Sequence, residues 1–321
     1  MMYIHIFHLI DLLREIEVFR DLSNFEEAIN HSIRMRTSIE DAITSEKIFK
    51  SFFPLRNPKK KTAYLIGTGP SLKKIDVSRL KNHDTITFNR AYVAFDDWGF
   101  DPTYYLAIDS QDLLSISHDI KDMMVNRGIK HYFLPHGQGF EDESYKKYND
   151  KITLLKDTPE SWKMVLNFSE YVFLDKQNLM ITPVLSSAGY MGLKMLYLMG
   201  YQEVALLGCD ARYRTDEESQ KSITWDEDGC VSHADYDPNH FRDDYFGKGQ
   251  RFGRPIDEDE TMKIWTTCLT NIQAHSQIPQ EYSDLMDCDQ TFKVYSCSEG
   301  SLLNSIFPYV DFKDFMNGKR E

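Results

Sequence analysis

The pattern of apolar and polar residues divides the chain into two parts. Residues 1–55 contain no glycine, and their apolar side chains recur every three or four positions, which is the period of an amphipathic helix. The segment PLRNPKKK at 54–61 interrupts this pattern with two prolines and a run of lysines. We therefore expect an N-terminal helical extension over 1–58 and a separate domain over 59–321.

Short apolar runs replace the helical period after residue 60. They have the length of buried strands, and several end in glycine or in a polar residue. Runs of this character cover 62–67, 84–89, 103–109, 129–135, 203–210 and 292–298. Helix-like stretches lie between several of them, the clearest at 186–201. Apolar strands that alternate with helices predict an α/β fold, with a Rossmann-like, mainly parallel sheet and helices on both faces.

One long segment follows neither period. Residues 211–256 are rich in Asp, Gly, Arg, His and aromatic residues. A loop of this length inside a compact domain is usually functional, so we expect a lid over the binding site. The next segment, 257–276, has the pattern of a helix with an acidic first turn.

Composition and charge narrow the classes of partner. The net charge is −13 and the one dense basic run is Lys59–Lys61, so nucleic acid is not expected as a partner. The five cysteines form no CxxC pair, which predicts reduced thiols and no metal site. No apolar run approaches the roughly 18–20 residues that cross a bilayer, and the start does not have the pattern of a signal peptide.

These properties predict a cytoplasmic protein. The N-terminal helices have three alternative partners, namely the body of the protein, a second subunit in a homo-oligomer, or the surface of the inner membrane.

The turn after the first predicted strand has two interpretations. In TAYLIGTGPSLKKI, Gly67 and Gly69 remove side chains where a phosphate or ribose would approach, and Ser71 offers a hydroxyl. The dinucleotide fingerprint is incomplete because Leu72 stands where its last glycine belongs, and no Walker A sequence is present. The turn is therefore either a nucleotide cradle or a tight corner between a strand and a helix.

Polar residues end three of the predicted strands. Asn89, Asp109 and Asp210 each follow an apolar run. The carboxyl ends of parallel strands meet at one edge of a sheet, so the three side chains would converge on one crevice. The alternative for each residue is a helix N-cap or an Asx turn.

Three segments resemble a known family. LIGTGPSLKKIDVSRL, with FNRAY after it, resembles the N-terminal half of the bacterial sialyltransferases of Campylobacter-type lipooligosaccharide synthesis. SSAGYMGLKMLYLMGYQEVALLGCDARY and VYSCSEGSLLN are similar to later parts of those enzymes. The resemblance covers roughly 62–110, 181–213 and 291–305. The same residues are similar to a wider superfamily, DUF115, which includes motility-associated nonulosonic acid transferases and an archaeal hydroxymethylpterin pyrophosphokinase.

The resemblance implies an inverting glycosyltransferase that needs no metal. The donor would be a CMP-sugar carrying a sialic-acid-like (nonulosonic) sugar, and the acceptor would be a glycan. The implied donor-binding residues are Gly67, Thr68, Gly69 and Ser71 at the phosphate and ribose, Asn89 at the nucleotide, Asp109, Ser186 and Ser187 near the sugar, and Asp210 at the cytidine. Tyr213 would donate a hydrogen bond to the leaving phosphate.

Departures from the family concern the base and the donor site. The family base is a lid histidine, but Lys248 stands at the comparable point, so we assign the base to His240, with His233 as an alternative. Thr68 replaces a family asparagine, and so does Asp109, whose carboxylate would repel an anionic sugar.

Two other functions are compatible with the same residues. A pyrophosphokinase would use ATP and Mg²⁺, with Asp109 and Asp210 as metal ligands. A non-catalytic binding module would keep the crevice and lack the base.

Overall fold

The computed structural model describes residues 60–108, 110–135, 139–140, 143–156, 173–174, 179–181, 187–213, 221–226, 229–252, 258–259, 261–266 and 292–320. The helical extension expected over 1–58, and most of the helix expected over 257–276, lie outside the described residues.

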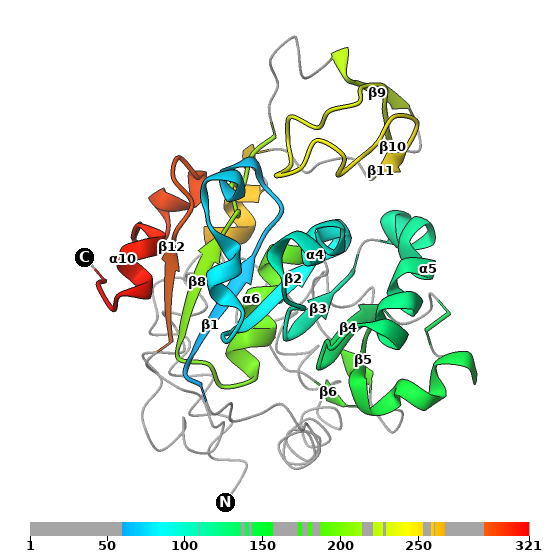
Figure 1. Cartoon of the computed structure of the whole chain (residues 1–321), viewed down its shortest axis with the longest axis horizontal. Helices are drawn as coiled ribbons and strands as arrows, with labels where there is room; N and C mark the ends of the chain where they lie inside the picture. Colours follow the sequence, from blue (N-terminus) through cyan, green and yellow to red (C-terminus); the bar gives the residue numbers. More distant parts are fainter. Residues whose placement is uncertain are drawn as a thin grey trace, which may run out of the picture.

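A nine-stranded sheet with the order β12-β8-β1-β2-β3-β4-β5-β7-β6 forms the centre of the fold (Figure 1). Every neighbouring pair is parallel except β6 with β7. The strands are β1 (Thr62–Ile66), β2 (Asp84–Phe88), β3 (Tyr104–Leu106), β4 (His131–Pro135), β5 (Ile152–Lys156), β6 (Phe173–Leu174), β7 (Leu179–Ile181), β8 (Glu203–Leu207) and β12 (Lys293–Ser296). Each predicted apolar run contains one of these strands, so the mainly parallel sheet is confirmed.

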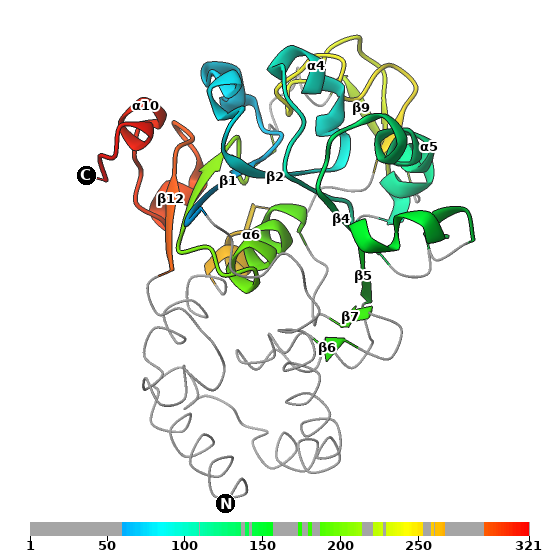
Figure 2. The same ribbon diagram turned by 60° about the horizontal axis from the view of Figure 1, so that its bottom comes forward.

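Helices cover both faces of the sheet, as predicted (Figure 2). Successive strand residues point to opposite faces, so Leu65 packs with helix α6 (Ala188–Leu198) while Ile66 packs into the core on the other face. That second face is covered by α4 (Phe95–Trp98), α5 (Ser110–Asn126), α10 (Phe312–Met316) and the 3₁₀ helices η2 (Pro70–Lys74), η3 (Val77–Leu80) and η4 (Asn89–Ala94). Two further 3₁₀ helices are η5 (Glu143–Lys151) and η7 (Leu302–Ser305).

The segment expected to be an irregular lid contains a small antiparallel sheet. Its strands, in the order β11-β10-β9, are β9 (Ile223–Asp226), β10 (Gly229–Ser232) and β11 (Arg251–Phe252). Figure 1 places this sheet beyond the end to which the arrowheads of β1 and β8 point. Cys230 and Phe252 belong to the same buried cluster as Ile66, so the lid sheet packs on the main domain.

The order of the strands locates the crevice of the fold. From β1 the chain adds β2, β3, β4 and β5 on one side, and it later adds β8 and β12 on the other side. The switch point therefore lies between β1 and β8. In open α/β sheets this is where ligands bind, outside the carboxyl ends of the strands.

Two expectations from composition, on membrane-spanning segments and on cysteines, can be compared with the described residues. No helix among them is long and apolar enough to cross a bilayer. Cys209, Cys230 and Cys297 are buried free thiols.

Candidate functional site

The glycine turn meets the end of β8 at the switch point. The Gly67 N–H donates to the Leu207 carbonyl at 2.6 Å, and the Gly69 N–H donates to the Gly208 carbonyl at 2.8 Å. A Cβ at Gly67 would lie 2.5 Å from the Gly208 oxygen, and a Cβ at Gly69 would overlap the Asp210 carboxylate. Both glycines are therefore required by the close approach of two segments of the chain itself.

Ser71 and Asp210, both predicted site residues, contact each other. The Ser71 N–H donates to Asp210 Oδ2 at 2.9 Å, which ties the turn after β1 to the end of β8. The Ser71 side chain is nearly buried, and its Oγ has no hydrogen-bond partner among the described residues. Leaving such a group unpaired costs about 1–3 kcal/mol. The hydroxyl of this turn thus has hydrogen-bonding capacity left for a ligand, whereas the Gly67, Gly69 and Ser71 amides already donate within the chain.

Asn89 carries a second unpaired atom at the neighbouring strand end. It follows β2 with φ 50, a left-handed conformation that asparagine tolerates better than most residues. Its carbonyl accepts a hydrogen bond from the Tyr105 hydroxyl at 2.5 Å. Its side-chain Oδ1 is buried without a partner in the described part of the chain. The ends of β1 and β2 therefore each present one unsatisfied side-chain oxygen.

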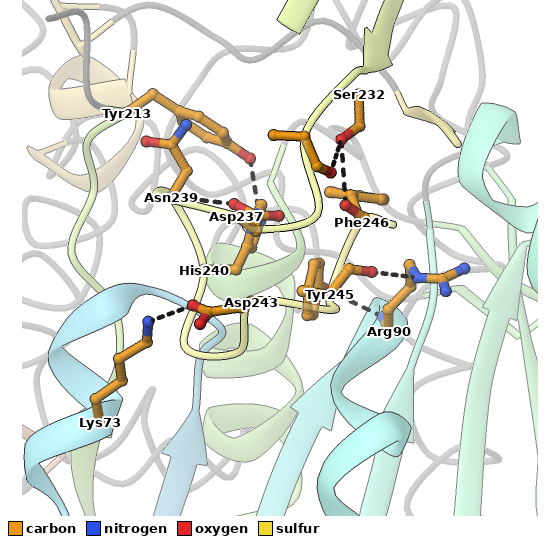
Figure 3. Close-up of polar contacts among 11 residues, drawn as sticks. Lys73, Arg90, Tyr213, Ser232, Asp237, Asn239, His240, Asp243, Tyr245 and Phe246 are labelled. Atoms are coloured by element: carbon orange, nitrogen blue, oxygen red, sulfur yellow. Dashed lines mark hydrogen bonds and ion pairs between the residues drawn. The ribbon is translucent and has the colours of Figure 1, made fainter. Parts of the chain in front are cut away.

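The lid contributes an ordered carboxylate–imidazole–phenol chain (Figure 3). His240 Nδ1 lies 2.8 Å from Asp237 Oδ2, and the two residues are 6% and 7% exposed. Asp237 Oδ1 accepts from the Asn239 N–H at 2.9 Å. A carboxylate only accepts, so Nδ1 carries the proton and Nε2 of the neutral ring keeps its lone pair. That Nε2 lies 3.4 Å from the Tyr213 hydroxyl, which can donate to it.

Aromatic rings enclose the imidazole. The His240 and Tyr245 rings are stacked with their centroids 4.0 Å apart, and Phe246 meets His240 edge-on. A cavity of about 10 Å³ adjoins the ring, enough for about one water molecule. It is lined mainly by lid residues, among them Tyr213, Ser222, Ser232, Asp237, Asn239 and His240.

The lid segment that holds His240 is fixed to the strand ends. The Phe241 N–H donates to the Thr68 carbonyl at 2.9 Å, so the residue after the histidine contacts the glycine turn directly. Two residues that follow His240 extend this attachment. Lys73 Nζ donates to Asp243 Oδ1 at 2.9 Å, and Arg90 Nε donates to the Tyr245 carbonyl at 2.8 Å (Figure 3). The proposed base therefore lies above η2 and η4, the helices that follow β1 and β2.

Four predicted site residues remain, namely His233, Ser187, Asp109 and Ser186. His233 is exposed, and its Nε2 contacts Thr224 Oγ1 at 2.6 Å in the lid sheet, outside the Asp237–His240–Tyr213 chain. Ser187 is the N-cap residue of α6 without a side-chain capping bond. Asp109 and Ser186 lie outside the described residues. Of the two carboxylates considered for magnesium, Asp210 is thus the one that the structure describes.

Three residues of this site were not predicted from the sequence. Asp237 fixes His240, Tyr245 stacks on it, and Arg90 ties the lid to η4. Only Asp237 had a local signal, a carboxylate three positions before a histidine.

Comparison with known proteins adds remote structural likeness. No family model matches the chain, and no curated protein matches it. The sialyltransferase CstII from Campylobacter jejuni, in complex with a substrate analogue, cytidine-5′-monophosphate, is 16% identical with a TM-score of 0.39, and the match covers 78% of this chain and 84% of that one. The MAf glycosyltransferase from Magnetospirillum magneticum AMB-1 is 13% identical with a TM-score of 0.40, and the match covers 82% of this chain and 37% of that one.

Proposed function

We propose that this chain is a glycosyltransferase that transfers a sialic-acid-like sugar from a CMP-sugar donor to a hydroxyl of a glycan acceptor. The observation that carries the proposal is the Asp237–His240–Tyr213 chain, held above the carboxyl ends of the central strands. The segments that resemble the sialyltransferases contribute the strand ends beneath it. Two groups with acid–base character thus belong to a lid segment that is hydrogen-bonded to the chain after β1 and β2, where the two unpaired side-chain oxygens lie.

The donor site is assigned to the two unpaired oxygens. The Ser71 hydroxyl can donate to a phosphate or ribose oxygen, and Asn89 Oδ1 can accept from the amino group of a cytosine. Both atoms are buried. We infer that the donor enters when the segment 237–246, which is hydrogen-bonded to Thr68 and Arg90, moves away from the strand ends. Gly67 and Gly69 shape the corner, and they hold no phosphate themselves.

The chemistry is a single displacement. The acceptor oxygen forms a bond to the anomeric carbon while the bond to the phosphate oxygen breaks, and its electron pair leaves with CMP. His240 takes up the acceptor proton, and Asp237 stabilises the imidazolium that forms. Direct displacement inverts the anomeric configuration, and none of these steps requires a metal ion.

Calorimetric titration with CMP, CDP, UDP and ATP with Mg²⁺ tests the donor assignment. CMP should bind most tightly, and Asn89→Ala should weaken it about tenfold, the effect of one lost hydrogen bond to the base. Asn126→Ala, at the exposed end of α5, serves as a control and should bind CMP like wild type. Binding of ATP with Mg²⁺ but not CMP would support a pyrophosphokinase instead, and no nucleotide binding would support a non-catalytic module.

A further inference from the structure

His240 is enclosed on the sides that an acceptor sugar would need. Its Nδ1 is occupied by Asp237, and one face of its ring is covered by Tyr245. The cavity beside it accommodates about one water molecule, which is far smaller than a sugar ring. Nε2, the atom with the free lone pair, faces the Tyr213 hydroxyl. A proton from a glycan hydroxyl therefore needs an intermediate group to reach this base.

We propose that Tyr213 is that group and relays the acceptor proton to His240. Tyr213 is only half-buried, whereas His240 is almost fully buried, so the phenol is the member of the chain that a substrate can touch. The inference rests on the proposed glycosyl transfer and specifies its proton path. It assigns Tyr213 to the acceptor side, in place of the leaving-phosphate contact that the family resemblance implies.

The relay moves two protons in one direction. The acceptor O–H bond breaks, and its proton passes to the Tyr213 oxygen as the phenolic proton passes to His240 Nε2. The acceptor oxygen bonds to the anomeric carbon, and the electron pair of the broken C–O bond leaves on CMP. The imidazolium is paired with Asp237 and later releases its proton to solvent. Because the phenol gains one proton as it loses another, no free phenolate forms, and a hydroxyl both accepts and donates as this step requires.

The backbone before Tyr213 places the phenol for this role. Ala211 has φ 56, a left-handed conformation that costs an L-residue about 1–2 kcal/mol and redirects the chain as it leaves β8. Tyr213 follows two residues later, and its hydroxyl lies 3.4 Å from His240 Nε2. Residues held in such conformations are characteristic of functional sites.

A double-mutant cycle on CMP release tests the relay. Tyr213→Phe and His240→Gln should each slow transfer by about 10²–10⁴-fold, the usual effect of losing general base catalysis. If both residues act in one proton path, the double variant should be no slower than the slower single variant within about threefold. Losses that multiply would show two independent roles and overturn the relay. Tyr309→Phe, an exposed tyrosine near the C-terminus, is the control and should transfer at the wild-type rate.

A second measurement needs no substrate. In ¹⁵N NMR spectra His240 should show a protonated Nδ1 and a hydrogen-bonded Nε2. Tyr213→Phe should move the Nε2 resonance while the protein stays folded. An unchanged resonance would overturn the relay whatever the rates. Wild-type protein that releases no CMP from a CMP-nonulosonate would overturn the proposed function, and the relay with it. Multiplying losses in an active enzyme would overturn the relay alone.

Discussion

Replacing Asp237 with asparagine changes one atom of the buried chain and leaves its shape intact. Asp237 accepts two hydrogen bonds, from His240 Nδ1 and from the Asn239 N–H. An amide has only one accepting oxygen. If that oxygen stays on Asn239, the NH₂ group faces Nδ1 and forces the imidazole proton onto Nε2. His240 then donates toward Tyr213 and cannot take up a proton there.

The structural and chemical effects of Asp237→Asn should differ in size. Two charge-assisted bonds become neutral ones, which costs about 1–3 kcal/mol of unfolding free energy. For a domain of this size each kcal/mol lowers Tm by about 2–4 °C. Transfer should fall by about 10²–10⁴-fold because the base is in the wrong tautomer. Asp237→Ala should cost more stability, about 2–6 kcal/mol, since it leaves two buried N–H groups without an acceptor.

Thermal denaturation, CMP release and ¹⁵N NMR of the histidines separate these effects. Asp235→Asn is the matched control, because Asp235 is exposed on the same loop and should affect neither Tm nor rate. Wild-type turnover by Asp237→Asn, or a proton that stays on Nδ1, would refute the assignment of Asp237 and with it the use of His240 as base.

Three further predictions test the supporting structure. Gly69→Ala must displace the Asp210 carboxylate and should lower the unfolding free energy by about 2–5 kcal/mol. Gly247→Ala is the control, because its new Cβ meets nothing within 4 Å and should leave stability unchanged. Equal urea midpoints for the two variants would contradict the close approach at the switch point. Burial lowers the pKa of His131 to about 3, so the unfolded chain binds a proton that the folded chain excludes, and the free energy of unfolding falls as the pH drops below about 6.5. This histidine should account for about 2 kcal/mol of the loss between pH 7 and 5. His131→Asn should therefore show a shallower pH dependence of its urea midpoint than wild type. Arg90→Lys keeps the charge but loses the hydrogen bond from Nε to the Tyr245 carbonyl. Amide hydrogen exchange across 237–246 should therefore accelerate about three- to tenfold, with little change at β1. An unchanged exchange rate would show that this contact does not hold the lid.

Local sequence patterns predicted the mainly parallel character of the central sheet and six of its nine strands, and they missed β5, β6 and β7. Apolar runs of strand length, alternating with helices, identify a covered parallel sheet because both of its faces must be buried. The lid strands could not be found in this way. Their residues lie in a segment that mixes polar residues, glycine and aromatic residues, so no continuous apolar run marks them.

The candidate site was predictable in part. Strand-end positions identified Asn89 and Asp210, because polar residues after apolar runs stand out in the sequence. The pairing of His240 with Tyr213 depends on the path of the chain between them, and no spacing encodes it. The glycines at 67 and 69 show a similar limit. Sequence alone does not distinguish a turn that approaches a ligand from one that approaches its own backbone.

The most direct test of the proposed transfer follows phosphorus in a single mixture. Wild-type protein is incubated with CMP-N-acetylneuraminate, a pool of glycan acceptors, ATP and Mg²⁺, and ³¹P NMR records which nucleotide is consumed. If the chain transfers the sugar as proposed, CMP should accumulate while ATP persists, and His240→Gln should suppress the CMP signal. An intact CMP-sugar beside ATP that is converted to AMP would contradict it.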